Sequence, residues 1–253
     1  MKTLFFSDLD NTLIYSHRKD APGDAIWIER LNGNLQSFMT QATYSFFLSQ
    51  QSFSVIPVTT RSELQYSRLQ SMTRELGWHD ALICNGAVLM KDGVVDRQWL
   101  YDSKQIATCD LCSLFDIYHQ LSLRVKPQSM VSLFDLMFYL TRLEDIDNIY
   151  AWINENADLE HLFIARDSRK IYVIPKSLHK GAAVQRYLSK VKHTITFAAG
   201  DSIFDLPMLS EVDCGFLPKS YTGLIPSNVQ VLDSLYYSDA ICDKLRILTK
   251  RCR

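Results

Sequence analysis

The sequence has no hydrophobic run that approaches the roughly 18 residues needed to cross a bilayer, which argues against a membrane-spanning helix. It also has no excess of one charge, because 27 Lys and Arg stand against 28 Asp and Glu, a net charge of −1. We therefore expect no broad surface for nucleic acids or membranes. The N-terminal apolar run is interrupted by Asp8 and Asp10, so we expect no signal peptide.

Cysteines are few, with six in 253 residues. Cys109 and Cys112 form an isolated C-x-x-C pair, and no second pair follows at a zinc-binding spacing. Without a secretion signal, we interpret these cysteines as reduced thiols and expect a cytoplasmic protein. Internal repeats are absent too, which excludes a solenoid. The remaining composition, 47% hydrophobic and 22% charged, is typical of a globular chain with one or two domains.

Short apolar runs alternate with helical periodicity along the first third of the chain. The expected elements are a strand at 3–7, a helix beginning at residue 35, a strand at 53–59, a helix at 62–76 and a strand at 81–84. The helix from residue 35 is based on apolar side chains at positions 35, 38, 39, 42 and 46. Strands that alternate with helices in this way predict a parallel α/β sheet.

The pattern changes at residue 88, where two apolar stretches flank Lys91-Asp92-Gly93 and predict an antiparallel hairpin. Strand and helix signals alternate again after residue 175. We interpret the chain as an α/β core of 1–87 and 176–253, interrupted by an inserted α+β domain of 88–175. A single irregular α+β domain is the alternative.

Two acidic side chains directly follow the first strand, in Phe6-Ser7-Asp8-Leu9-Asp10. In an open parallel sheet, ligands bind outside the carboxyl ends of the strands, which is where Asp8 and Asp10 fall. Neighbouring carboxylates repel each other, and a bound Mg²⁺ would relieve that repulsion. The plainer alternative is a solvated strand end with an Asx turn.

A second acidic pair, Asp201 and Asp205, follows another expected strand, and Gly200 allows a tight turn before it. Asp201 would then reach the same crevice as Asp8, although it could instead cap a helix. Two strand ends with the same acidic chemistry favour a metal site over two unrelated caps.

Groups suited to phosphate lie between these acidic pairs. Thr59 and Arg61 follow the second strand and offer a hydroxyl and a guanidinium, although the segment could serve as a helix N-cap. Lys180 begins an expected helix, the end where the helix dipole disfavours a cation. Its charge there suggests a role in neutralising a phosphoryl group.

Taken together, these segments resemble the four motifs of the haloacid dehalogenase superfamily, in order. The motifs are Asp8-Leu9-Asp10-Asn11-Thr12, Thr59, Lys180 and Gly200-Asp201-Ser202-x-x-Asp205. Asn85-Gly86-Ala87 before the insert and His179-Lys180-Gly181 after it resemble the Cof-type branch, subfamily IIB. The resemblance implies a Rossmann-like parallel-sheet core with an inserted α+β cap domain of the C2 type.

The resemblance also implies a two-step phosphoryl transfer. Asp8 would attack phosphorus and form an aspartyl-phosphate, and Asp10 would act as general acid and then as general base. Mg²⁺ would be held by the Asp8 carboxylate, the Asp10 backbone carbonyl and Asp201, with Asp205 either as an additional ligand or as a residue that supports the ligands. Thr59 and Lys180 would bind phosphoryl oxygens, and we add Arg61 and Asn85 as further phosphate-binding candidates.

The function implied is a Mg²⁺-dependent phosphatase acting on a small phosphorylated metabolite, in particular a sugar phosphate. A phosphosugar mutase of the same fold and a non-catalytic metabolite-binding protein are the alternatives. Neither the substrate nor the oligomeric state follows from the sequence, because substrate choice depends on cap residues that match no pattern.

Overall fold

The computed structural model describes residues 2–167 and 169–251, and these form two compact units. The core unit comprises Met1–Asp96 and Lys180–Arg253, and the inserted unit comprises Arg97–His179. The boundary lies at Arg97, not at residue 88, because the hairpin after residue 88 pairs with a strand of the core unit. The second boundary lies after His179, where the expected position is 175.

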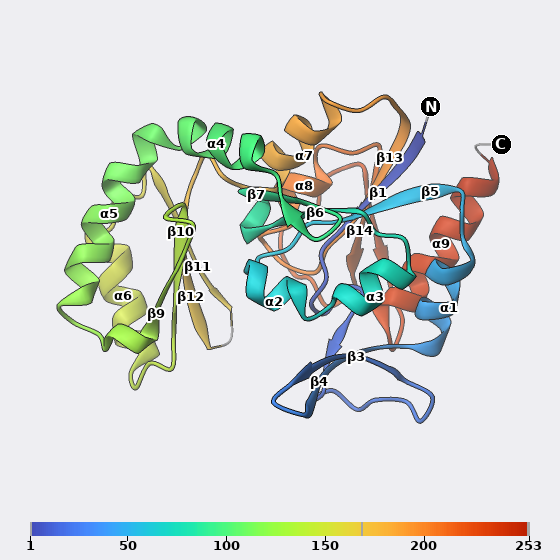
Figure 1. The fold of residues 1–253 in the computed structure, drawn as a ribbon, viewed down its shortest axis with the longest axis horizontal. Coiled ribbons are helices and arrows are strands. Elements are labelled where there is room, and N and C mark those ends of the chain that lie inside the picture. The colour runs from blue at the N-terminus through green and yellow to red at the C-terminus, as the bar shows by residue number, and fades with distance from the viewer. Residues whose placement is uncertain (1, 168, 252–253) are drawn as a thin grey trace. The chain divides into compact units, whose positions relative to one another are not determined.

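A five-stranded parallel sheet forms the centre of the core unit (Figure 1). Its strands are β1 (Lys2–Ser7), β5 (Phe53–Pro57), β13 (His193–Ala199), β14 (Cys214–Pro218) and β15 (Val229–Leu232). Their order in the sheet is β15-β14-β13-β1-β5, and every neighbouring pair is parallel. The strand β1 is therefore central, with its apolar side chains buried on both faces. The expected α/β class with a parallel sheet is confirmed.

Six α-helices in the described part of the core unit connect or flank these strands. They are α1 (Gln41–Ser49), α2 (Glu63–Ser67), α3 (Gln70–Glu75), α7 (Lys180–Leu188), α8 (Leu206–Leu209) and α9 (Tyr237–Arg251). A capping box starts α2, in which Ser62 accepts from the backbone of Gln65 and the Gln65 side chain accepts in return from the backbone of Ser62. The expected helix at 62–76 therefore starts as predicted, but it is divided into α2 and α3.

The helix expected from residue 35 is wrong for residues 35–39 and correct only from Gln41 onward. Residues Asn34–Met39 form strand β4, which pairs antiparallel with β3 (Ile26–Leu31) and β2 (Tyr15–Ser16) in a three-stranded sheet. The reason is the turn at Asn32 and Gly33, which both have positive φ, as a tight hairpin requires. The helix α1 begins only after Thr40, whose side chain accepts a hydrogen bond from the amide of Thr43.

The strand expected at 81–84 exists but is not part of the parallel sheet. It is β6 (Asp80–Ile83), which pairs antiparallel with β7 (Val88–Lys91), followed by β8 (Val94–Val95). A single parallel bridge, Val58 to Leu82, links this small sheet to the end of β5. The hairpin predicted around Lys91-Asp92-Gly93 is confirmed.

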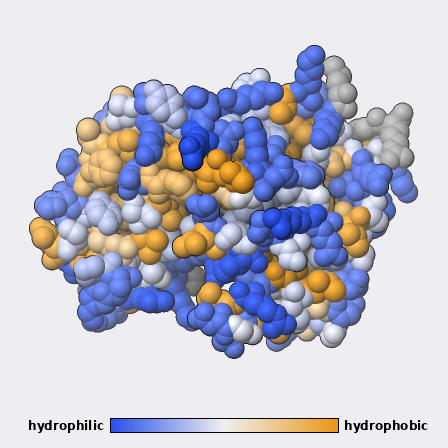
Figure 2. Space-filling view, viewed as in Figure 1, coloured by the Kyte–Doolittle hydropathy of each residue, from blue (hydrophilic) through white to orange (hydrophobic). Residues whose placement is uncertain are grey.

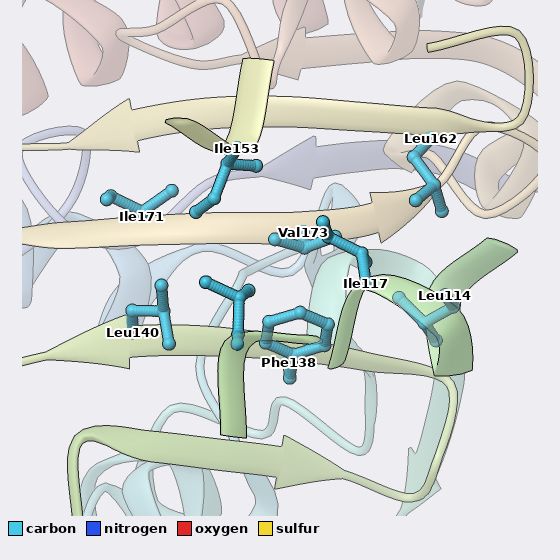
Figure 3. Close-up of a cluster of buried hydrophobic side chains, with 9 residues drawn as sticks. Leu114, Ile117, Phe138, Leu140, Ile153, Leu162, Ile171 and Val173 are labelled. Carbon is cyan, nitrogen blue, oxygen red and sulfur yellow. The ribbon is translucent and has the colours of Figure 1, made fainter. Parts of the chain in front are cut away.

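The inserted unit has its own sheet and its own hydrophobic core. The antiparallel strands, in sheet order, are β11 (Leu162–Asp167), β12 (Lys170–Pro175), β10 (Met137–Thr141) and β9 (Met130–Leu133). The helices are α4 (Arg97–Ile106), α5 (Thr108–Ser122) and α6 (Ile146–Asn156). Figure 3 shows side chains of α5, such as Leu114 and Ile117, packed against Phe138 and Val173 of the sheet. The α+β character expected for the insert is confirmed.

The surface mixes polar and apolar residues, as Figure 2 shows for one face of each unit. Across residues 2–167 and 169–251, no helix combines the length and the apolar character required to span a membrane.

Candidate active site

The acidic motif after β1 is held at the carboxyl end of the central strand. The amide of Asp8 donates to the carbonyl of Ala199 at 2.9 Å, which continues the β1–β13 pairing by one residue. The chain then turns tightly, because the amides of Leu13 and Ile14 both donate to the carbonyl of Leu9 at 2.9 Å. Asp8 is thereby fixed in a buried position where the parallel strands end.

Lys180 connects two segments of this site that are far apart in the sequence. It is the first residue of α7, and its Nζ lies 2.6 Å from Asp8 Oδ1 and 2.6 Å from Asp205 Oδ1. The ammonium group is almost completely buried, and burial alone would lower its pKa. The attraction of Asp205 and Asp8 outweighs that effect and raises the pKa of Lys180 above its usual value. Lys180 therefore stays cationic between the two acids.

The environment of Asp8 favours its neutral form when no metal ion is bound. Burial raises the pKa of Asp8 to about 7, although Lys180 acts in the opposite direction. The nearby charges of Asp205 and Asp10 raise this pKa further. A cation placed beside Asp8 would remove this penalty and restore the carboxylate.

The loop between β13 and α8 presents the second acidic pair. Asp205 Oδ2 accepts hydrogen bonds from the amides of Asp201 and Ser202, each at 3.0 Å, and from the Ser202 hydroxyl at 2.9 Å. Gly200 is required here, because a Cβ at this position would lie 2.2 Å from Asp205 Cβ. Asp205 therefore shapes the loop with one carboxylate oxygen and binds Lys180 with the other.

These acids have the arrangement of a site for a hard divalent cation. One carboxylate oxygen from each of Asp8, Asp201 and Asp205 lies within 4.8 Å of the others. Oxygen ligands from carboxylates are what Mg²⁺ prefers, so the residues present fit this ion. Thr12 also contacts the group, with its hydroxyl 3.4 Å from Asp201 Oδ1.

The Asp10 carboxylate has a different partner from the other site acids. It forms a bidentate ion pair with Arg61, with Nε to Oδ2 at 2.7 Å and Nη2 to Oδ1 at 2.8 Å. The same guanidinium binds Glu29 and the carbonyl of Gln65. Arg61 was expected among the phosphate-binding residues, but its donors already contact these acceptors, so we now interpret it as a partner of Asp10.

Thr59 and Asn85 lie together where β5 and β6 end. The amide of Asn85 donates to the carbonyl of Thr59 at 2.9 Å, and the Thr59 hydroxyl accepts from the amide of Arg61 at 3.2 Å. The register that pairs Ser7 with Pro57 brings Thr59 to the same edge of the sheet as Asp8. Both side chains are buried, and Asn85 has a positive φ of 59°.

Two residues of this region were missed in the sequence. Glu29 binds Arg61 from strand β3, and a signal existed, since an acid interrupts the apolar stretch Ile26-Trp27-Ile28. Tyr237, the first residue of α9, is buried beside the acidic group. Burial, with Asp205 and Asp201 nearby, raises the pKa of Tyr237 well above its usual value. No sequence pattern points to Tyr237.

Comparisons with known proteins relate part of the sequence to a hydrolase family. A family model described as haloacid dehalogenase-like hydrolase matches residues 126–217. No protein of curated function matches the sequence significantly.

Several solved structures have the same fold over nearly the whole chain. Sucrose-phosphatase from Synechocystis sp. PCC6803, solved with sucrose and phosphate, is 15% identical, with a TM-score of 0.61 over 97% of each chain. A haloacid dehalogenase-like hydrolase from Bacteroides thetaiotaomicron is 11% identical, with a TM-score of 0.59 over 98% of this chain and 100% of that one. A trehalose-6-phosphate phosphatase from Aspergillus fumigatus is 12% identical, with a TM-score of 0.56 over 99% of this chain and 93% of that one. Residues 126–217 are thus similar to haloacid dehalogenase-like hydrolases, and the whole chain shares the fold of these solved structures.

Proposed function

We propose that the protein is a Mg²⁺-dependent phosphatase that hydrolyses a small phosphorylated metabolite of the sugar-phosphate class. The observation that carries this proposal is the position of Lys180 between Asp8 and Asp205, with Asp201 in the same acidic group. A buried nucleophile, a fixed cation and a divalent-metal site are what phosphoryl transfer requires. The sugar-phosphate class is supported by the sucrose-phosphatase and trehalose-phosphate phosphatase among the solved structures with this fold.

In this mechanism, an Asp8 oxygen attacks phosphorus and forms an acyl-phosphate bond as the bond to the leaving oxygen breaks. Asp10, which must first take up a proton, gives that proton to the leaving oxygen and then takes a proton from the water that attacks the aspartyl-phosphate. Inorganic phosphate leaves, and Asp8 and Asp10 return to their starting states.

The other residues supply charge and position. Asp8, Asp201 and Asp205, with the Asp10 carbonyl, would hold Mg²⁺, which supplies positive charge against the phosphoryl oxygens. Lys180 and Thr59 would bind these oxygens, and we keep Asn85 as a further donor beside Thr59. Residues 97–179 would act as the cap that selects the leaving group.

The compartment and the partners also belong to this proposal. The described cysteines, at positions 84, 109, 112, 214 and 242, are all free thiols. Free thiols fit a reducing compartment, so we propose a cytoplasmic enzyme whose partner is its small phosphorylated substrate. We propose no nucleic-acid partner, because the net charge is close to zero.

The test is phosphate release from a panel of sugar phosphates and other metabolite phosphates, with Mg²⁺ and with EDTA. We expect Mg²⁺-dependent release that the Asp8→Asn variant abolishes, because the amide cannot act as the nucleophile. Retained activity in Asp8→Asn would contradict the role of Asp8. Isomerisation that requires a bisphosphate primer would indicate a mutase, and tight binding of Mg²⁺ and substrate without turnover would indicate a binding protein.

A further inference from the structure

The three-stranded sheet of β2, β4 and β3 brings a buried carboxylate next to the candidate active site. Glu29 lies on β3 and is 4% exposed. Its Oε2 accepts a hydrogen bond of 2.7 Å from Ser37 on the neighbouring strand β4, with which it is in register. The sheet thus orients the Glu29 side chain independently of its contacts with the residues of the site.

Glu29 Oε2 also binds the guanidinium that holds Asp10. Arg61 Nη1 and Nη2 each donate to this oxygen at 3.1 Å, while Nε and Nη2 donate to the two oxygens of Asp10. A further bond of 3.3 Å runs from Nη1 to the carbonyl of Gln65. These hydrogen bonds use the full donor fork of an arginine, so the orientation of the Arg61 guanidinium is determined by its acceptors.

The charges in this group are balanced. Arg68 Nε lies 3.1 Å from Glu29 Oε1, so two cations, Arg61 and Arg68, accompany two anions, Asp10 and Glu29. A buried arginine is stabilised as a cation when carboxylates surround it. Glu29 therefore makes it possible for Arg61 to stay charged and buried beside Asp10.

We propose that Glu29 is a positioning residue for catalysis, which acts through Arg61 to orient the Asp10 carboxylate. The Asp10 side chain is half-exposed, whereas Arg61 and Glu29 are buried. The two buried side chains therefore determine the orientation of the Asp10 carboxylate. A bidentate arginine fixes the plane of a carboxylate, and a buried acid behind that arginine fixes the arginine. This role rests on the proposed function, in which Asp10 exchanges protons with the leaving oxygen and with water.

The leaving group separates this role from a purely structural one. An alkoxide leaves only if it receives the Asp10 proton as the phosphorus–oxygen bond breaks, whereas p-nitrophenolate leaves as a stable anion. An incorrectly oriented Asp10 therefore slows phosphoryl transfer from an alkyl phosphate more than from p-nitrophenyl phosphate. General loss of folded protein would lower both rates by the same factor.

The experiment compares kcat/KM for a hexose phosphate and for p-nitrophenyl phosphate in the wild type and in Glu29→Gln. We expect a loss of about tenfold or more for the hexose phosphate, as is typical when a group that orients a catalytic side chain is removed. For p-nitrophenyl phosphate we expect a loss below about threefold, since proton donation matters little there. Asp24→Asn, which removes an exposed acid from the same segment, is the matched control and leaves both values unchanged.

Two further variants make the test independent of whether Glu29→Gln folds correctly. Ser37→Ala removes the hydrogen bond that holds Glu29 and should shift the ratio of the two kcat/KM values in the same direction, by less. Glu29→Gln combined with Arg61→Ala should show no larger effect on this ratio than Arg61→Ala alone, because both changes break one chain of contacts.

Equal losses for the two substrates, or an unchanged ratio in both Glu29→Gln and Ser37→Ala, would overturn the role of Glu29 while leaving the phosphatase intact. A folded wild-type protein that hydrolyses neither substrate would instead refute the proposed function, and the role of Glu29 with it.

Discussion

Buried Lys180, Asp8 and Asp205, together with half-buried Asp201, leave a charge imbalance in the core unit. When all are ionised, Asp8, Asp201 and Asp205 contribute three negative charges and Lys180 contributes one positive charge. Buried charge of this kind is costly unless it is paired or bound to a metal ion. A divalent cation would neutralise the two remaining negative charges, whereas a second lysine would neutralise only one of them. The charge balance therefore supports Mg²⁺ at this site.

The raised pKa of Asp8 predicts how Mg²⁺ stabilisation depends on pH. The pKa of Asp8 rises from its ordinary value of 3.8 to about 7. Between these two pH values, Asp8 therefore keeps a proton in the metal-free folded state that it has lost in the unfolded state. Stability from this group is therefore full at low pH and is lost as pH rises towards 7. Mg²⁺ binding requires the ionised carboxylate and must displace that proton.

We expect the increase in Tm caused by Mg²⁺ to be larger at pH 7.5 than at pH 5.5. Thermal unfolding with and without Mg²⁺ at the two pH values measures this difference. Asp8→Asn, which has no proton to displace, should show an increase that depends less on pH. An increase of the same size at both pH values in the wild type would contradict the titration of Asp8.

Among the individual elements, the β13–α8 loop depends on a single glycine. A Cβ on residue 200 would lie 2.2 Å from Asp205 Cβ and 2.8 Å from its Oδ2. The Asp205 side chain cannot easily move away, because it is held by hydrogen bonds from the amides of Asp201 and Ser202. The loop would therefore have to move, and the acids of the metal site with it.

Gly200→Ala should weaken Mg²⁺ binding by tenfold or more and lower stability by about 1–3 kcal/mol, the usual cost of a forced overlap in a packed region. Calorimetric Mg²⁺ titration and chemical unfolding measure the two effects. Gly23→Ala is the control, because a Cβ there meets no atom within 4 Å. Equal Mg²⁺ affinity in Gly200→Ala and the wild type would show that the loop tolerates a side chain.

The β3–β4 hairpin shows where local sequence patterns are ambiguous. Apolar residues at 35, 38 and 39 fit one face of a helix, but Phe38 and Met39 also belong to a buried strand. The turn at Asn32 and Gly33 and the cap at Thr40 decide between these possibilities. The turn and the cap are not part of the hydrophobic periodicity, so periodicity alone predicted the wrong element for residues 35–39.

At the scale of the whole molecule, the two units have separate hydrophobic interiors. In the inserted unit, Phe138 is buried in the hydrophobic cluster (Figure 3). Its ring meets the ring of Tyr118 edge to face, with the centroids 5.1 Å apart. In the core unit, Phe5 packs against Phe47 and Phe53 instead. Separate cores allow one unit to lose stability without the other.

Phe138→Ala should destabilise the inserted unit by about 3–5 kcal/mol, the typical cost of removing a buried phenylalanine ring. Hydrogen exchange read by mass spectrometry should show faster exchange within 97–179, while β1 and β13 keep the protection of the wild type. An equal increase in both units would show that the chain unfolds as one cooperative body.

The sequence by itself determined the parallel α/β class and the α+β insert, and it indicated Asp8, Lys180, Asp201 and Asp205 as candidate site residues. These follow from local signals, since strand–helix alternation and acids at strand ends are properties of neighbouring residues. Only the tertiary structure placed Lys180 between Asp8 and Asp205, paired Arg61 with Asp10 and brought Glu29 into contact with Arg61. Contacts between positions 10, 29 and 61 depend on how two sheets meet, and no local pattern encodes that geometry.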